Sequence, residues 1–165
     1  MAKNGFDAYG VDFSKFAIKT AVKNSLKEKT SKKTRFRQAN ALNLPFQDNF
    51  FDFVNDDGCL HHIAKKDWKK YLQNIGRVLK KNGLARIKVF SKNCEYYKKN
   101  KPKANKTPWI KLRDSNWTYF FEKNELKELF ERKFKAISIF ERAHKKDKNK
   151  KFFFEKTDIS EIAPR

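Results

Sequence analysis

The sequence predicts an α/β fold built around a mostly parallel sheet, with an antiparallel hairpin near the C-terminal end. Short segments rich in Phe, Val and Ile alternate along the chain with longer segments whose apolar residues recur every three or four positions. This alternation favours a parallel sheet, because a helix between two strands returns the chain to the same edge. After Phe121, a helical pattern is followed by two apolar strand patterns separated by a polar turn, which is typical of a hairpin.

The N-terminal segment predicts a strand, a helix and a second strand. Residues 6–13, FDAYGVDF, form a short extended pattern, and Ser14 stands where the N-cap of a helix belongs. The helix is expected to run to about Lys29, because its apolar residues share one face: Ala17, Ile18, Ala21, Val22 and Leu26. Residues 34–39, TRFRQA, predict the second strand.

The middle of the chain predicts a further strand, helix and strand. Residues 50–57, FFDFVNDD, predict a strand that is buried on both faces and continues into Gly58. Asp67 is expected to cap a helix with six apolar residues at helical spacing: Trp68, Tyr71, Leu72, Ile75, Val78 and Leu79. Gly83 is expected to end this helix as its C-cap, and residues 84–90, LARIKVF, predict a buried strand.

The C-terminal part of the chain predicts a loop, a helix and the hairpin. Residues 91–116 form a variable, lysine-rich insert, and its first part, 91–108, is too polar for the core. A helix is expected through three apolar residues, Leu126, Leu129 and Phe130. Residues 134–143 and 152–157 are expected as the two hairpin strands, joined by the polar turn 144–151.

Length and composition bound the function. At 165 residues, with 39% hydrophobic residues including 17 Phe, the chain is expected to fold as a single globular domain, residues 1–165. Forty Lys and Arg against 19 Asp and Glu give a net charge of +21, which attracts phosphate-bearing partners such as RNA. The charge equally fits a chain whose composition is lysine-rich throughout and serves no partner, so both interpretations stay open.

Cysteine, histidine and apolar patterns exclude several classes of protein. Cys59 and Cys94 are the only cysteines, which argues against a disulfide framework or a zinc knuckle and favours a reducing compartment. His61 and His62 are adjacent and point in different directions, so they make a poor chelating pair and no metal is expected. No apolar run approaches the ~18 residues of a membrane span, and the N-terminus lacks a signal-peptide core. A cytoplasmic protein without a membrane partner is expected.

Three segments carry a resemblance to a known family: GFDAYGVDFSKFAIKTA, QANALNLPFQDNFFDFVNDDGCLHHI and IGRVLKKNGLARIKVF. In this order and spacing they resemble consecutive blocks of the class I, Rossmann-like, S-adenosylmethionine-dependent methyltransferases. Residues 117–140 are similar to the closing helix and antiparallel strand pair of that family. The resemblance covers about residues 5–143. It implies a Rossmann-like fold, S-adenosylmethionine as the cofactor, and methyl transfer to an acceptor that the sequence does not identify.

The resemblance also implies a nucleoside site at the carboxyl ends of the first two strands. Asp12 would accept hydrogen bonds from the ribose hydroxyls, and Phe13 would lie against the adenine face. The adenine edge would meet Asn40, Ala41 and Leu42, although members of the family usually carry an acid where this chain has Asn40. As an alternative, Asp12 is simply an acid at the entry of a helix.

The carboxyl end of the strand at 50–57 carries the remaining site candidates. Asp56 or Asp57 would hold the amino group of the cofactor or orient the acceptor nucleophile, and both are candidate catalytic residues. His62 matches the histidine of the family motif and is the third catalytic candidate. It can also be read as a structural histidine packed below the site, because methyl transfer needs orientation more than a dedicated base.

One departure from the family concerns the N-terminus. The family begins with a strand and a glycine-rich loop that hold the cofactor, and no such loop occurs in this sequence. The resemblance therefore implies a domain whose first βα unit is missing, with Gly5 as the C-cap of the helix that follows that loop. Two interior strand edges would then lack a partner. A mis-started frame, a split protein completed by a complementing chain and a degenerate domain all fit this departure.

The methyl acceptor is expected to be RNA, on the basis of charge, or a small molecule, and the insert at 91–116 is expected to decide between them. A rival function is a non-catalytic, basic RNA-binding module derived from a methyltransferase domain. In that function Tyr96, Tyr97 and Trp109 would stack on bases while the lysines of 96–106 and 144–151 contact phosphates. These residues can also be a solvated loop with ordinary packing.

Overall fold

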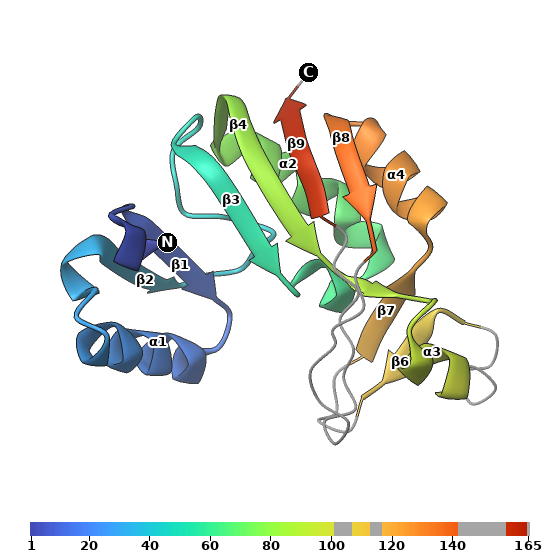
Figure 1. Ribbon diagram of the computed structural model, residues 1–165, viewed down its shortest axis with the longest axis horizontal. Coiled ribbons are helices and arrows are strands. Elements are labelled where there is room, and N and C mark those ends of the chain that lie inside the picture. The colour runs from blue at the N-terminus through green and yellow to red at the C-terminus, as the bar shows by residue number, and fades with distance from the viewer. Residues whose placement is uncertain (101–106, 113–116, 142–157, 165) are drawn as a thin grey trace. The chain divides into compact units, whose positions relative to one another are not determined.

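The computed structural model describes residues 1–100, 107–112, 117–141 and 158–164, with only the backbone described for 135–138 and 158–164 (Figure 1). The chain divides into two compact units, Met1–Pro45 and Phe46–Arg165, and each is described by itself. None of the described helices has both the length and the apolar character that crossing a bilayer requires.

The first unit contains the expected strand, helix and strand. Strand β1 (Ala8–Asp12) pairs in parallel with β2 (Thr34–Gln38), and helix α1 (Lys15–Lys27) followed by the 3-10 turn η2 (Ser31–Lys33) connects them. The predicted N-cap is confirmed, because Ser14 Oγ accepts a hydrogen bond from the Ala17 N–H at 3.2 Å. The single 3-10 turn η1 (Ala2–Asn4) ends at Gly5, which has a φ of 89° as expected for a C-cap.

Helix α1 buries less of its apolar face than its pattern predicts. Ala17, Ile18 and Ala21 are half-buried, but Val22 is 43% and Leu26 62% exposed. Among the described residues, the sheet of this unit has only two strands, β1 and β2, and it leaves part of the apolar stripe of α1 uncovered. The predicted helix is confirmed, but the last two residues of its apolar face, Val22 and Leu26, remain exposed.

The second unit begins with strand β3 (Phe51–Asp57), which pairs in parallel with β4 (Leu79–Lys88). Two 3-10 turns, η3 (Leu60–His62) and η4 (Lys65–Asp67), and helix α2 (Trp68–Val78) connect them. Five of the six predicted apolar residues are buried on α2, and the sixth, Leu79, is buried at the start of β4. Asp67 occupies the N-cap position, but its side chain makes no capping hydrogen bond, so the predicted capping role was wrong.

Gly83 lies inside β4 and not at the end of α2. The helix ends at Val78, and Leu79 is already extended and paired with Phe51. The next pair joins Leu84 to Phe53, so the intervening residues of β4 form a bulge, in which Asn82 has a φ of 68°. A Cβ at Gly83 would lie 3.1 Å from the carbonyl O of Phe51. A larger residue would crowd this carbonyl, so the close backbone approach favours glycine here, and the predicted C-cap was wrong.

The segment after β4 contributes to the core, against expectation. It contains β5 (Phe90–Ser91), α3 (Glu95–Asn100), β6 (Trp109–Lys111) and β7 (Trp117–Phe121), and β7 pairs in parallel with β5 and antiparallel with β6. A buried cluster joins these elements: Phe90, Cys94, Tyr97, Ile110 and Phe120. Single apolar residues among the lysines therefore form a core. The polar composition of the segment as a whole gave no indication of it. Residues 101–106 and 113–116 of the predicted insert lie outside the described residues.

The C-terminal part forms the expected helix and hairpin. Helix α4 (Lys123–Glu131) buries Leu126 and Phe130, and β8 (Phe134–Phe140) pairs antiparallel with β9 (Asp158–Pro164). Figure 1 shows β9 between β8 and β4, and the contacts between β4 and β9 agree. The turn at 144–151 and the strand at 152–157 lie outside the described residues. The predicted α/β fold with a mostly parallel sheet and a C-terminal antiparallel hairpin is confirmed.

All three tryptophans of the sequence lie in the second unit. Trp68 is buried, Trp109 is half-buried and Trp117 is 58% exposed. The Trp68 indole N–H donates a hydrogen bond to the carbonyl O of Ile63 at 2.9 Å, and its ring packs against Tyr119 with the centroids 4.8 Å apart. Trp68 therefore ties the start of α2 to the neighbouring strand β7.

Candidate functional site

In the first unit, the predicted nucleoside residues gather at the carboxyl ends of β1 and β2. Asp12 ends β1, and its carbonyl O accepts a hydrogen bond from the N–H of Ala39, directly after β2, at 3.0 Å. Gln38, the last residue of β2, donates from Nε2 to the carbonyl O of Phe13 at 2.9 Å. The parallel pairing thus brings Asp12, Phe13 and the turn that begins at Asn40 to one edge.

The carboxylate of Asp12 is exposed and only partly satisfied. Its Oδ1 accepts a hydrogen bond from the Ser14 N–H at 2.7 Å, which is the helix-entry role of the alternative interpretation. Its Oδ2 makes no hydrogen bond to any described residue. The carboxylate can therefore shape the entry of α1 and still accept a donor from a ligand. The predicted ribose contact stays a prediction.

The other first-unit candidates differ in what they offer. The Phe13 ring is 78% exposed, so an aromatic face is open to solvent. Asn40 is exposed, but its Oδ1 accepts a hydrogen bond from the Leu42 N–H at 2.9 Å and its carbonyl O accepts from Asn43. Ala41 and Leu42 are half-buried in this turn. The oxygen of Asn40 is thus partly committed to the turn, which leaves its amide donors for a ligand.

In the second unit, Asp56 is buried, 7% exposed, and holds the turn that follows β3. Its Oδ1 accepts from the backbone N–H groups of Gly58 and Cys59 at 2.8 and 2.5 Å. Its Oδ2 accepts from the Leu60 N–H at 2.9 Å and from the Tyr71 hydroxyl at 2.5 Å. Four donors fill the acceptor sites of a carboxylate. The buried charge is thereby stabilised, and the turn is held against β3.

The saturation of Asp56 bears on its predicted ligand role. Burial and the neighbouring Asp56 carboxylate raise the pKa of Tyr71 well above its ordinary value, so the tyrosine stays a hydrogen-bond donor at neutral pH. With every acceptor site occupied, the Asp56 carboxylate can bind a cofactor only after one of these bonds breaks. The cofactor and catalytic roles of Asp56 stay predictions, and the observed geometry favours a turn-forming role.

Asp57, the next residue, has the opposite environment. Its carboxylate is 58% exposed, and its Oδ1 lies 2.5 Å from Nζ of Lys88. Lys88 is the register partner of Asp57 on β4, so the ion pair joins the carboxyl ends of the two strands. Asp57 is therefore the more accessible of the two predicted carboxylates.

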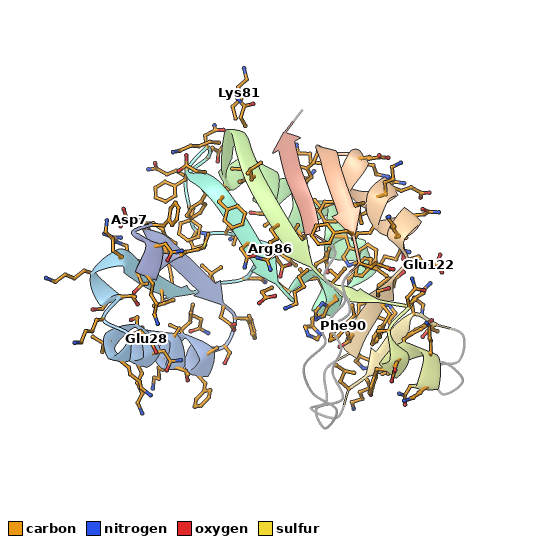
Figure 2. The ribbon with its side chains drawn as sticks, in the orientation of Figure 1. Asp7, Glu28, Lys81, Arg86, Phe90 and Glu122 are labelled. Atoms are coloured by element: carbon orange, nitrogen blue, oxygen red, sulfur yellow. The ribbon has the colours of Figure 1, made fainter. Side chains whose placement is uncertain are left out.

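His61 and His62 divide into a buried and an exposed residue. The His61 ring is 2% exposed and packs against His62 and against Phe90, which lies where β4 gives way to β5 (Figure 2). Burial, reinforced by the nearby charges of His62 and Lys88, lowers the pKa of His61 to about 3, so its imidazole is neutral near pH 7. Gly58 has a φ of 115°, and a Cβ there would lie 3.1 Å from the His61 ring. This turn therefore needs glycine on two grounds.

His62 is exposed, and its Nδ1 donates a hydrogen bond to the carbonyl O of Trp117 on β7 at 3.0 Å. The expectation of a histidine packed below the site was therefore placed on the wrong residue, because His61 is the buried one. Nε2 of His62 makes no hydrogen bond to a described residue, so it can accept one from a ligand. Its catalytic role stays a prediction.

Sequence reasoning missed a polar cluster at the ends of β5 and β8. The buried Ser91 hydroxyl donates to Oε1 of Glu141 at 2.8 Å, and Nδ2 of Asn93 donates to the same carboxylate at 3.0 and 3.1 Å. The partners are about fifty positions apart in the sequence, so no local motif signals them. A serine directly after a buried strand pattern was the only available signal.

Within the described ranges, no group of three or more His, Cys, Asp or Glu side chains is arranged to hold a metal ion. Cys59 is exposed and Cys94 buried, and neither forms a disulfide. The first-unit candidates are Asp12, Phe13, Asn40, Ala41 and Leu42, and those of the second unit are Asp56, Asp57 and His62. Each group is brought together within its own unit.

Comparison with known proteins identifies relatives of this chain. Residues 1–87 match the family described as methyltransferase domain. The chain is 39% identical over 82 residues to 2-phytyl-1,4-naphtoquinone methyltransferase of Nostoc punctiforme, covering 50% of this chain and 35% of that protein. It is 28% identical over 142 residues to phosphoethanolamine N-methyltransferase 2 of Caenorhabditis elegans, covering 75% of this chain and 32% of that protein. The chain thus spans about a third of the length of these relatives.

Solved structures share the fold at low sequence identity. A SAM-dependent methyltransferase from Methanosarcina mazei superposes with a TM-score of 0.81 at 20% identity, covering 98% of this chain and 85% of that one. The 1,6-didemethyltoxoflavin-N1-methyltransferase of Burkholderia thailandensis, solved with S-adenosylhomocysteine, gives a TM-score of 0.69 at 19% identity, covering 99% and 64%. These likenesses confirm the Rossmann-like fold. The match to the methyltransferase domain family covers residues 1–87, more than half of the 165 residues. The chain therefore belongs to this family.

Proposed function

We propose that this chain forms part of an S-adenosylmethionine-dependent methyltransferase and that its first unit binds the nucleoside end of the cofactor. The observation that carries the proposal is the exposed Asp12 carboxylate, with Oδ2 open, beside the exposed ring of Phe13. Membership of the methyltransferase domain family supports the activity. The neighbour from Burkholderia thailandensis, solved with S-adenosylhomocysteine, supports the choice of cofactor.

The first-unit residues fit a nucleoside chemically. Oδ2 of Asp12 can accept a hydrogen bond from a ribose hydroxyl, and a charged acceptor makes such a bond stronger. The Phe13 ring offers a face on which adenine can stack. The turn from Asn40 to Leu42 offers amide donors and an apolar edge. Binding of a ribose and a purine calls for a carboxylate, an aromatic face and a polar turn. All three lie at this edge.

In the second unit we assign contact with the acceptor to Asp57 and His62, because both side chains are exposed whereas the Asp56 carboxylate is saturated. S-adenosylmethionine, when bound, supplies a methyl group activated by a sulfonium charge. Asp57 can orient a donor group of the acceptor by a hydrogen bond, and His62 can take a proton from it through Nε2. Asp56 and Tyr71 keep the turn between these two residues in place.

Two acceptor classes have support. The names of the Nostoc punctiforme and Caenorhabditis elegans relatives specify a naphthoquinone and phosphoethanolamine, which supports a small molecule as the acceptor here. The net charge of +21 supports an RNA acceptor. We favour the small molecule, because the charge is distributed over both units and marks no single acceptor site, whereas both relatives are named for small substrates.

Calorimetric titration of the chain with S-adenosylhomocysteine tests the proposal. Saturable one-to-one binding is expected, since the demethylated product retains the ribose and adenine groups that Asp12 and Phe13 would contact. Circular dichroism of the same sample shows whether the protein is folded. Absence of binding by a folded chain would contradict the proposal and favour the alternative, a non-catalytic RNA-binding module. Radiolabelled methyl transfer to RNA or to a small-molecule extract then separates the acceptor classes.

The open edges of the two parallel strand pairs support a second proposal, that a further strand pairs with them. Among the described residues, β1 belongs to a two-stranded sheet with β2, and β3 to another with β4. Two-stranded sheets are marginally stable in water, and an open edge is a template for another strand. The strand would come from a further part of the same polypeptide or from a complementing chain.

Mass spectrometry of the protein isolated from its own cells tests this second proposal. Under native conditions, a species heavier than the 19.7 kDa of residues 1–165 is expected. Denaturing conditions then distinguish a longer polypeptide from a separate complementing chain. A single native species of 19.7 kDa that binds S-adenosylhomocysteine would contradict the need for an added strand.

A further inference from the structure

Four lysines form a regular row along helix α1. They follow one another at intervals of four residues and all are exposed: Lys15, Lys19, Lys23 and Lys27. In an α-helix, each interval advances about 6 Å along the axis and about 40° around it, so the row is about 18 Å long. We call these four residues the lysine row.

The lysine row is not neutralised within the described residues. Helix α1 contains no Asp or Glu, and none of the four ammonium groups forms an ion pair with a described residue. Helix α4 differs, because it contains Glu125, Glu128 and Glu131, and its Lys127 lies 3.6 Å from Glu131. Like charges four residues apart destabilise a helix slightly. Repulsion within the lysine row therefore destabilises the isolated helix slightly. An anionic partner would remove this repulsion.

Exposed apolar side chains lie within the arc of the lysine row. At 100° per residue, Leu26 and Phe16 fall about 20° and about 100° from Lys15, inside the arc of about 120° that the four lysines span. Leu26 is 62% and Phe16 is 78% exposed. A helix that lies in a membrane interface instead separates an apolar face from a charged face. The mixture of cations and an aromatic ring on one face fits a partner that carries both phosphates and bases.

We propose that the lysine row of α1 binds the phosphate backbone of single-stranded RNA. The interval of about 6 Å between successive lysines is comparable with the spacing of neighbouring phosphates along a nucleic-acid strand, so one lysine can meet each phosphate. Phe16 stands where a base of that strand can stack on its ring. The proposal goes beyond methyl transfer and holds whether or not RNA is the acceptor.

The test compares two variants of equal net charge. The row variant changes four lysines of α1 to glutamine: Lys15→Gln, Lys19→Gln, Lys23→Gln and Lys27→Gln. The control variant removes four exposed lysines of the second unit, including Lys81, which projects outward in Figure 2: Lys66→Gln, Lys69→Gln, Lys70→Gln and Lys81→Gln. Both carry a charge of 21 − 4 = +17. Glutamine has nearly the helix propensity of lysine, so α1 should persist.

Fluorescence anisotropy with labelled oligouridylate gives the affinity at several salt concentrations. For the row variant, we expect a loss of at least tenfold at low salt and a fall of about 3 in the slope of log K against log salt, from four lost phosphate contacts. The control variant should change the slope by less than 1. Equal losses in both variants would overturn the proposal, because diffuse charge would then explain binding. Failure of the unmodified protein to bind RNA would overturn it too.

Three further measurements make the result specific. A variant with arginine at the four row positions keeps the charge and should keep RNA binding. Vesicles of phosphatidylserine and phosphatidylcholine should bind the row variant as strongly as they bind the control variant. If the row variant loses binding to vesicles but not to RNA, the proposal is overturned in favour of a lipid surface. S-adenosylhomocysteine affinity should be equal in all variants, so the cofactor proposal can fail or hold separately.

Discussion

Strand β1 of the first unit ends in Asp12, and strand β3 of the second unit carries Asp56 next to its last residue. The carboxylates of Asp12 and Asp56 have opposite environments. Asp12 is exposed, with one oxygen engaged by the Ser14 N–H. Asp56 is buried, with three backbone N–H groups and the Tyr71 hydroxyl bound to it. A buried charge must be satisfied by the protein itself, whereas a group that binds a ligand has to keep acceptor capacity. A position near the end of a strand therefore does not define the function of an aspartate. The hydrogen bonds that its carboxylate already makes within the protein do.

The largest expected effect is at the saturated carboxylate. Asp56→Ala leaves three backbone donors and the Tyr71 hydroxyl without their partner, so we expect the free energy of unfolding to fall by about 3 to 5 kcal/mol. Urea denaturation measures the change. Asp57→Ala is the matched control, because its carboxylate is 58% exposed and its ion pair with the partly buried Lys88 should cost less to lose, about 1 to 2 kcal/mol, than the four hydrogen bonds of Asp56. Equal losses in the two variants would mean that Asp56 is not the organiser of the turn.

The next effect is a pH dependence at His61. Its folded pKa of about 3 lies below the ordinary 6.5, so below pH 6.5 the unfolded chain binds a proton that the folded chain does not. Stability is therefore unaffected by this group above pH 6.5 and decreases as pH falls from 6.5 toward 3, by at most about 1.4 kcal/mol per pH unit.

Denaturation at pH 7, 6 and 5 tests the contribution of His61. His61→Gln should flatten the decline between pH 6.5 and 5, whereas the control His62→Gln should retain it, because His62 is exposed. If both variants follow the unmodified protein, another group causes the decline. The comparison also assigns the buried position to one histidine of the adjacent pair.

A smaller effect is expected in cofactor affinity at the open carboxylate. Asp12→Ala should weaken S-adenosylhomocysteine binding by about 1 to 3 kcal/mol, the usual loss for a hydrogen bond to a charged group. Asp7→Ala, an exposed acid just before β1 that faces Lys33 and Arg35, removes the same charge and should leave the affinity unchanged. Unchanged affinity in both variants, measured by calorimetry, would remove Asp12 from the site.

The smallest effect is expected at His62. His62→Asn removes the hydrogen bond to the carbonyl O of Trp117, and because the site is exposed we expect a loss of about 0.5 to 1 kcal/mol. S-adenosylhomocysteine affinity should be unaffected. Unchanged stability combined with weaker binding would make His62 a ligand-binding residue of the second unit.

The sequence predicted those features whose partners are close along the chain. The Ser14 cap joins residues three positions apart, and the apolar spacing of α2 repeats within single turns, so both can be recognised locally. Gly83 was misassigned because the helix end competes with pairing between Leu79 and Phe51, which depends on a distant strand. The core role of Cys94 and Tyr97 was concealed by surrounding lysines for the same reason.

The candidate site was predictable in location but not in function. The polar ends of β1 and β3 identified the residues to consider, because within each parallel pair, β1 with β2 and β3 with β4, the carboxyl ends lie at the same edge. The environment of Asp56 depends on a tyrosine 15 positions later, and that of Ser91 on a glutamate 50 positions later. Of two adjacent histidines, His61 is the buried one and packs against Phe90, a contact between residues almost thirty positions apart.

The location of every tryptophan in the second unit gives the molecule a built-in spectroscopic asymmetry. Intrinsic emission excited near the red edge of protein absorption reports the melting of Phe46–Arg165 alone, with Trp68 in an apolar setting and Trp117 in water. Far-ultraviolet dichroism also includes the helix of the first unit. Coincident transitions by the two probes would indicate that the units melt cooperatively, and separated transitions would give each unit its own midpoint without labels or mutations.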